Sequence, residues 1–197
     1  AMIGSPVFRL TRDVLHNQYN ANCILQAKSG QKTEHWSEHT PKLQGRNPTV
    51  SNLIAQIPGT GRNSIVEISL GINDATPSQN TSADVAAFLK EGIAKLKEAK
   101  PDAVIIYTSP NLIGENNWNT KLREAAATVW EDKTIGKIDV TNGVMEDYYA
   151  TYYADNLHPT VKGYSAIAKF ILSNYFPQDY TYEKIVVTDP NLITLPA

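Results

Sequence analysis

Apolar runs alternate with amphipathic stretches along most of the chain. Residues 103–107 form a continuous apolar run that predicts a strand buried on both faces of a parallel sheet. Residues 64–70, with Ile65, Val66, Ile68 and Leu70, predict another buried strand. Shorter runs at residues 1–3, 23–27 and 136–140 predict three further strands. Apolar side chains at helical spacing separate these runs, in helices that we expect to begin near Pro6, Asn47, Ser82, Thr120 and Thr160.

The order of these elements predicts the fold class. Strands that alternate with helices, joined by short loops and right-handed crossovers, form a three-layer α/β sandwich with a parallel sheet of five strands. We assign residues 1–176 to this domain. Residues 177–197 form a C-terminal extension, with an extra strand at residues 184–187 and a linker-like end. We expect such an end to lead into further domains of a larger protein.

Composition and charge exclude several classes of function. The chain has 18 basic and 20 acidic residues and a formal charge of -2, without a Lys/Arg cluster, so no nucleic-acid partner is expected. No apolar run approaches the roughly 20 residues of a membrane span, so no membrane partner is expected. The first residues do not show a charged-then-apolar leader, so we expect either that the protein is not exported by that route or, as we favour, that the sequence is a fragment. Cys23 lies in an apolar run and is expected to be a buried, inert thiol. The compartment stays undetermined, with an extracellular or virion-associated setting slightly favoured.

The sequence DNLHP at residues 155–159 carries the strongest chemical signal. It places the Asp155 carboxylate and the His158 imidazole three residues apart, in a turn that Pro159 and Thr160 mark as the start of the last helix. A histidine held by a carboxylate is suited to general-base chemistry, because its ordinary pKa lies near neutral pH. The pair lacks a nucleophile of its own, so its meaning depends on residues elsewhere in the chain.

Three further residues follow predicted strands. Ser5 lies between the first strand and a helix, where it is either an N-cap or an oxygen nucleophile. Gly30 permits a close backbone approach, and the Asn73 amide can donate to a ligand. Because the C-terminal ends of parallel strands share one edge of a sheet, we expect all three to converge with Asp155 and His158. Together they supply a nucleophile, a base, an orienting carboxylate and oxyanion donors, as acyl transfer requires.

His35 and His39 are candidate metal ligands at helical i, i+4 spacing. Their order is not His-Glu-x-x-His, and no third ligand is evident in the polar stretch at residues 31–47. We therefore expect a solvated loop here and no metal site.

The chain resembles the SGNH (GDSL-type) hydrolase superfamily between about residue 3 and residue 173. The resemblance rests on Ser5, Gly30, the G-x-N-D motif at residues 71–74 and the D-x-x-H-P motif at residues 155–159, which follow the family's order. It implies a flavodoxin-like fold, the SGNH hydrolase fold, with strand order 2-1-3-4-5 and no cofactor.

The same resemblance implies a role for each residue. Ser5 would be the nucleophile, His158 the general base that later protonates the leaving alcohol, and Asp155 the group that orients the imidazole. The backbone N–H groups of Ser5 and Gly30 and the side-chain amide of Asn73 would hold the oxyanion.

The chain departs from the family at two places. The usual nucleophile block is Gly-Asp-Ser, whereas Gly4 stands here where the aspartate would be. The first predicted strand has only residues 1–3 before the motif, which favours a piece of a larger protein.

Aromatic residues near the predicted active edge indicate the substrate. Trp36, Trp118 and Tyr153 either contact a sugar or acyl group there or pack beneath a loop. No segment suggests an acyl-chain tunnel, so we expect short acyl esters, chiefly O-acetyl, on a polysaccharide or small molecule. Two other functions stay open. The first is a catalytically impaired carbohydrate-binding or structural module. The second is a nucleotide binder, which is disfavoured because residues 6–8, after the first predicted strand, do not form a Ser/Thr-rich phosphate loop.

Overall fold

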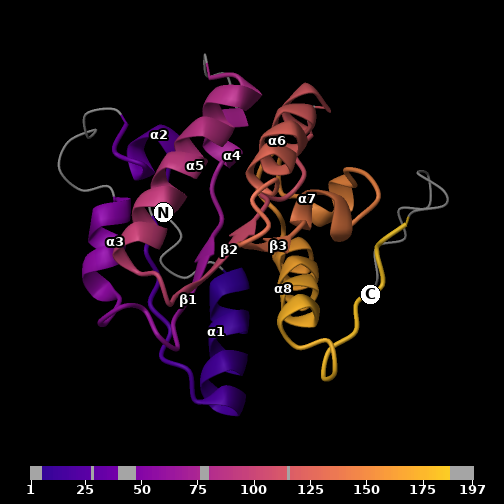
Figure 1. Cartoon of the computed structure of the whole chain (residues 1–197). Helices are drawn as coiled ribbons and strands as arrows, with labels where there is room; N and C mark the ends of the chain where they lie inside the picture. The colour runs from indigo at the N-terminus through magenta and orange to yellow at the C-terminus, as the bar shows by residue number, and fades with distance from the viewer. Residues whose placement is uncertain (1–5, 28, 40–47, 76–79, 115, 187–197) are drawn as a thin grey trace. The chain divides into compact units, whose positions relative to one another are not determined.

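The chain forms two compact units, and each is built from separate segments of the sequence. Figure 1 labels the helices and strands of both. The computed structural model describes residues 6–27, 29–39, 48–75, 80–114 and 116–186. The first unit contains Ile24–Pro110 and Asn117–Ile138. The second contains Ser5–Cys23, Asn111–Asn116 and the chain from Asp139 onward.

A parallel sheet lies at the centre of the first unit. Its strands are β1 (Ile65–Ile68), β2 (Val104–Thr108) and β3 (Gly136–Ile138), hydrogen-bonded in the order β1-β2-β3. Ile68 pairs with Tyr107 in the parallel register of β1 and β2. These strands confirm the third, fourth and fifth of the predicted strands and their adjacency.

The prediction of five strands is not confirmed. Residues 23–27 pair with no strand among the described residues, and residues 1–3 lie outside the described part of the chain. In the order 2-1-3-4-5, the second strand pairs only with the first. Residues 23–27 therefore have no described neighbour with which to form a ladder. Cys23 is half-buried rather than buried, and burial raises the pKa of its thiol.

Five helices belong to the first unit as the structure describes it. The longest, α5, begins after Thr81, whose hydroxyl accepts the N–H of Asp84 while the Asp84 carboxylate bonds back to Thr81. It ends at Lys100, before Pro101. The helices are α2 (Thr33–Trp36), α3 (Val50–Gln56), α4 (Ile72–Ala75), α5 (Ser82–Ala99) and α6 (Asn116–Val129).

The core of the first unit lies against one face of the sheet. Side chains of α2, α3, α5 and α6 share this core with alternate residues of the strands. On β1, Val66 and Ile68 are buried whereas Ile65 is 59% exposed. Val104 of β2 is 55% exposed, which corrects our expectation that residues 103–107 are buried on both faces.

The second unit is mainly helical. It contains α1 (Pro6–Tyr19), α7 (Val140–Gly143), the 3-10 helix η1 (Ala150–Tyr152) and α8 (Val161–Tyr175). The predicted first and last helices are confirmed by α1 and α8, which pack together. At their ends, the rings of Tyr19 and Phe176 stack with centroids 3.9 Å apart.

The beginning of the C-terminal extension contacts the second unit. The Ile185 N–H donates to the Val144 carbonyl at 3.1 Å, and the Glu146 N–H donates to the Ile185 carbonyl at 2.9 Å. The extra strand predicted at residues 184–187 is thus a single parallel bridge between Met145 and Ile185 in the described chain. Among all the residues that the structure describes, no helix is both long enough and apolar enough to cross a bilayer.

Candidate active site

Asp155 and His158 form a hydrogen-bonded pair in the second unit. His158 Nδ1 lies 2.9 Å from Asp155 Oδ2 and 3.2 Å from Asp155 Oδ1. An ionised carboxylate only accepts hydrogen bonds, so Nδ1 is the protonated ring nitrogen. Both side chains are 57% exposed. His158 Nε2 is then the nitrogen that can accept a proton from a nucleophile.

The Asp155 carboxylate is held in its ionised form by local hydrogen bonds. Its Oδ1 accepts the backbone N–H of His158 at 2.6 Å and that of Leu157 at 2.7 Å. The His158 backbone N–H, the His158 ring and the Leu157 N–H together lower the pKa of Asp155 to about 2. Asp155 is therefore a fixed negative charge beside the imidazole across the neutral range.

The backbone on both sides of the pair is closed into a short antiparallel turn. Tyr153 and Pro159 form an isolated antiparallel bridge, and the Thr160 N–H donates to the Tyr152 carbonyl at 2.9 Å. Thr160 then caps α8 by accepting the Gly163 N–H at 3.3 Å. This confirms that residues 159 and 160 begin the last helix. We call residues 154–159 the dyad loop.

Gly30 and Asn73 lie together in the first unit. The Asn73 side-chain amide donates to the carbonyl of Gln31, the residue after Gly30, at 3.0 Å. Gly30 has a φ of 74°, a left-handed conformation that glycine adopts without a steric cost. The hydrogen bond thus joins Asn73 to the residue that follows Gly30, the other predicted oxyanion donor of this unit.

Asp74 is a structural part of this site that the sequence argument did not recognise. It is fully buried, and it accepts the Thr33 backbone N–H at 3.0 Å and the Thr33 hydroxyl at 2.8 Å. Burial raises the pKa of Asp74, while these hydrogen bonds oppose the rise. Asp74 therefore ties α2 and the adjoining Gly30 turn to Asn73. The signal was available, because Asp74 completes the G-x-N-D motif.

The predicted aromatic contacts divide into buried and accessible residues. Trp36 is 5% exposed within α2 and packs on Gly92. This corrects the solvated loop expected at residues 31–47 over its described part, residues 31–39. Tyr153 is 6% exposed, and burial raises the pKa of its hydroxyl. Rings enclosed in this way present no free face to a sugar. Trp118, on α6, is half-buried and keeps part of its surface accessible.

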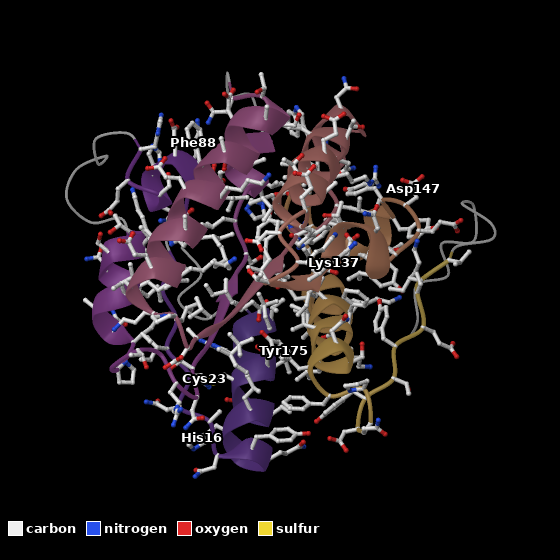
Figure 2. All side chains as sticks on the ribbon, viewed as in Figure 1. His16, Cys23, Phe88, Lys137, Asp147 and Tyr175 are labelled. Atoms are coloured by element: carbon white, nitrogen blue, oxygen red, sulfur yellow. The ribbon has the colours of Figure 1, made fainter. Side chains whose placement is uncertain are left out.

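The two histidines weighed as metal ligands have other partners. His39 Nδ1 lies 3.1 Å from Glu91 Oε2, and its ring packs against Phe88, which is labelled in Figure 2. His35 is buried, with its Nε2 3.7 Å from Glu34 Oε1. No group of three or more His, Cys, Asp or Glu residues suited to a metal ion occurs in the described ranges.

Ser5 lies outside the described residues. The structure therefore brings Asp155 to His158 in one unit and Gly30 to Asn73 in the other. The convergence of all five residues stays a prediction from the sequence.

Several solved structures are similar to this chain in fold. A catalytic mutant of an acetylxylan esterase from Geobacillus stearothermophilus aligns with a TM-score of 0.67 and 17% identity, over 95% of this chain and 86% of that chain. A putative GDSL-like lipase from Parabacteroides merdae aligns with a TM-score of 0.65 and 19% identity, over 87% and 82%.

A larger protein also shares the fold. A family two carbohydrate esterase from Clostridium thermocellum aligns with a TM-score of 0.58 and 15% identity. The alignment covers 87% of this chain but only 54% of the esterase, so this chain spans about half the length of that protein. At these identities the similarity establishes the fold alone.

The search of curated proteins found no match to the sequence. The model of the GDSL-like lipase/acylhydrolase family matches residues 6–166. This confirms the resemblance to the SGNH hydrolases, and the matched region contains Gly30, Asn73, Asp155 and His158. The chain belongs to the GDSL-like lipase/acylhydrolase family, whose members are carboxylic ester hydrolases.

Proposed function

We propose that this protein is a serine esterase that removes short acyl groups, chiefly O-acetyl, from a carbohydrate. The observation that carries the proposal is the Asp155–His158 pair, with Nδ1 2.9 Å from the carboxylate in a chain of this family. An ionised aspartate on Nδ1 leaves Nε2 as a base and stabilises the imidazolium that forms during catalysis.

The proposed reaction proceeds through an acyl-enzyme. His158 Nε2 takes the proton of the Ser5 hydroxyl as its oxygen attacks the ester carbonyl, and the same proton then goes to the leaving alcohol. In the second step His158 takes a proton from water as the water oxygen attacks the acyl-serine, and it returns that proton to the Ser5 oxygen as the bond from this oxygen to the acyl carbon breaks and the carboxylic acid leaves. The backbone N–H groups of Ser5 and Gly30 and the Asn73 amide stabilise the oxyanion, and the bond to Gln31 orients that amide.

The substrate class is supported by the similar structures rather than by a pocket. An acetylxylan esterase and a family two carbohydrate esterase share this fold. Trp118 is the accessible aromatic residue that we retain as a sugar contact. The buried rings of Trp36 and Tyr153 are left out of the proposed binding surface.

Acetate release from acetylated xylan, compared with hydrolysis of a long-chain lipid ester, tests this function. We expect preference for the acetylated glycan and a loss of at least about a thousandfold in kcat for Ser5→Ala. Ser51→Ala, which removes an exposed hydroxyl bonded to Glu38, is the matched control and should retain activity. Preference for the lipid ester would reject the substrate class, and an active Ser5→Ala protein would reject the nucleophile.

A catalytically impaired binding module is the second candidate. It is favoured by Gly4 at the position of the family's aspartate and by a family match that begins at residue 6, just after Ser5. Labelling by a serine-directed fluorophosphonate, mapped to the Ser5 peptide, distinguishes the two. Labelling supports the esterase, whereas glycan binding without labelling or ester hydrolysis supports the module.

A further inference from the structure

Four successive backbone carbonyls of the dyad loop, at residues 155–158, each accept a hydrogen bond from a different donor. All the donors belong to the second unit. In the order of the carbonyls, they are the Tyr148 hydroxyl at 3.0 Å, the Gly114 N–H at 2.7 Å, the Asn111 side-chain amide at 3.4 Å and the Ala154 N–H at 2.8 Å.

The opposite side of the same backbone is bound to the Asp155 carboxylate. Asp155 Oδ1 accepts the N–H groups of Leu157 and His158 at 2.7 and 2.6 Å. The carboxylate can keep this orientation only while the backbone of the loop keeps its own. Groups that hold the carbonyls thus also set the direction of the carboxylate toward His158 Nδ1.

Tyr148 and Asn111 both reach the loop through their side chains, and Tyr148 is the donor that binds the carbonyl of Asp155, the carboxylate residue of the pair. Its ring lies against Tyr153, with centroids 4.5 Å apart, and its hydroxyl bonds the carbonyl of Asp155 itself. Burial and the Asp155 charge both raise the pKa of Tyr148, so the phenol stays a donor at neutral pH. A rigid, half-buried ring is suited to fixing an exposed loop.

We propose that Tyr148 is a positioning residue for catalysis, whose hydroxyl holds Asp155 in register with His158. The inference rests on the proposed esterase function. Tyr148 does not touch the reacting atoms; it acts through the backbone of Asp155. Removal of its hydroxyl should misdirect the carboxylate and slow proton transfer, without weakening the binding of an ester.

Tyr148→Phe tests this role, because it removes the hydroxyl and keeps the ring against Tyr153. Tyr180→Phe is the matched control: its hydroxyl donates to Gln18 at 2.9 Å, away from the dyad loop. With nitrophenyl acetate we expect Tyr148→Phe to lower kcat by about tenfold with KM within about twofold. Tyr180→Phe should leave both constants within about twofold of the wild type.

Amide hydrogen exchange supplies a readout that does not depend on activity. The Leu157 and His158 amides should exchange at least about threefold faster in Tyr148→Phe and at the wild-type rate in Tyr180→Phe. Unchanged exchange at these amides in Tyr148→Phe, or equal effects in the two variants, would overturn the inference. If Ser5→Ala stayed fully active, the proposed function would fail, and the exchange comparison would still decide whether Tyr148 fixes the loop.

Discussion

Two aspartates in this chain show how strongly the local environment decides the behaviour of a carboxylate. Asp155 is exposed and accepts two backbone N–H groups and the His158 ring, which lower its pKa to about 2. Asp74 is fully buried, and burial raises its pKa despite the hydrogen bonds from Thr33. The exposed Asp155 carboxylate can orient and stabilise a charged imidazole, whereas the buried Asp74 carboxylate joins its own segment to Thr33 by hydrogen bonds.

Asp155→Asn should show how much of the activity depends on the negative charge of Asp155, because it removes that charge and keeps the shape of the side chain. The amide keeps the size of the side chain but loses the charge that holds Nδ1–H and stabilises the imidazolium. We expect kcat to fall by at least about a hundredfold, with the protein still folded. Steady-state hydrolysis of nitrophenyl acetate measures the loss. Activity near that of the wild type would contradict the assignment of Asp155.

The same substitution predicts a pH dependence of stability. The pKa of Asp155 falls from 3.8 to about 2 on folding, so its ionised form favours the folded state above the higher value. We expect the wild type to exceed Asp155→Asn in its urea midpoint above about pH 5, and the difference to shrink as the pH falls toward 2.

Asp132→Asn is a control for this pH dependence. Hydrogen bonds from Lys97 and Thr134 lower the pKa of Asp132 to about 2 as well, and Asp132 belongs to the other unit. It should show the same trend in the urea midpoint without any loss of activity. A constant difference between wild type and Asp155→Asn from neutral pH to about pH 2 would be incompatible with the lowered pKa.

At the scale of elements, α5 organises the core of the first unit. It packs against both α2 and α3, and its side chains Leu89 and Leu96 are fully buried. At Gly92, an added Cβ would overlap the Trp36 ring of α2. The helix therefore tolerates a glycine in its interior because the indole of α2 occupies the space.

Gly92→Ala should destabilise the protein although alanine favours helices. Overpacking a core costs about 1–3 kcal/mol, which exceeds the gain of up to about 1 kcal/mol in helix propensity. We expect a net loss of about 1 kcal/mol in the free energy of unfolding, measured with urea.

Trp36→Phe supplies the matched test, because a smaller ring leaves room for the methyl group. In the double variant, Gly92→Ala should cost less than in the wild-type background, a coupling of about 1 kcal/mol. Additive effects of the two substitutions would show that the contact between Gly92 and Trp36 does not limit packing.

At the scale of the whole molecule, the described part of the C-terminal extension, residues 177–186, packs on the second unit. The Tyr182 hydroxyl donates to the Val144 carbonyl at 2.8 Å, and its ring meets the edge of Phe170 with centroids 5.4 Å apart. Together with the bridge at Ile185, these contacts join residues beyond the predicted boundary at residue 176 to the segment that leads into the dyad loop.

Tyr182 variants measure what this attachment contributes. Tyr182→Phe should lower the free energy of unfolding by about 1 kcal/mol through the lost hydrogen bond. Tyr182→Ala should lower it by about 2–3 kcal/mol, because the ring contact is lost as well. Urea denaturation compares the two. Equal stability of Tyr182→Ala and the wild type would show that the extension contributes nothing to the fold.

Local chemistry explains why much of the fold could be predicted. Helices α5 and α8 begin at Thr81 and Thr160, whose hydroxyls accept the N–H group three residues on, so capping and apolar spacing were sufficient to find them within a residue or so. The strands at 64–70, 103–107 and 136–140 were identified from their apolar residues; the structure has the first and third shorter, and the second begins and ends one residue later.

The sequence by itself determined the Asp155–His158 pair, because an aspartate three residues before a histidine in a tight turn needs only local backbone geometry to meet the ring. It also determined the family, through short motifs. Only the tertiary structure decided that Trp36 is buried on Gly92, that Asp74 anchors Thr33 and that Tyr148 reaches the Asp155 carbonyl. Such contacts depend on which segments pack together, and that is set by the summed burial of many side chains rather than by local pattern.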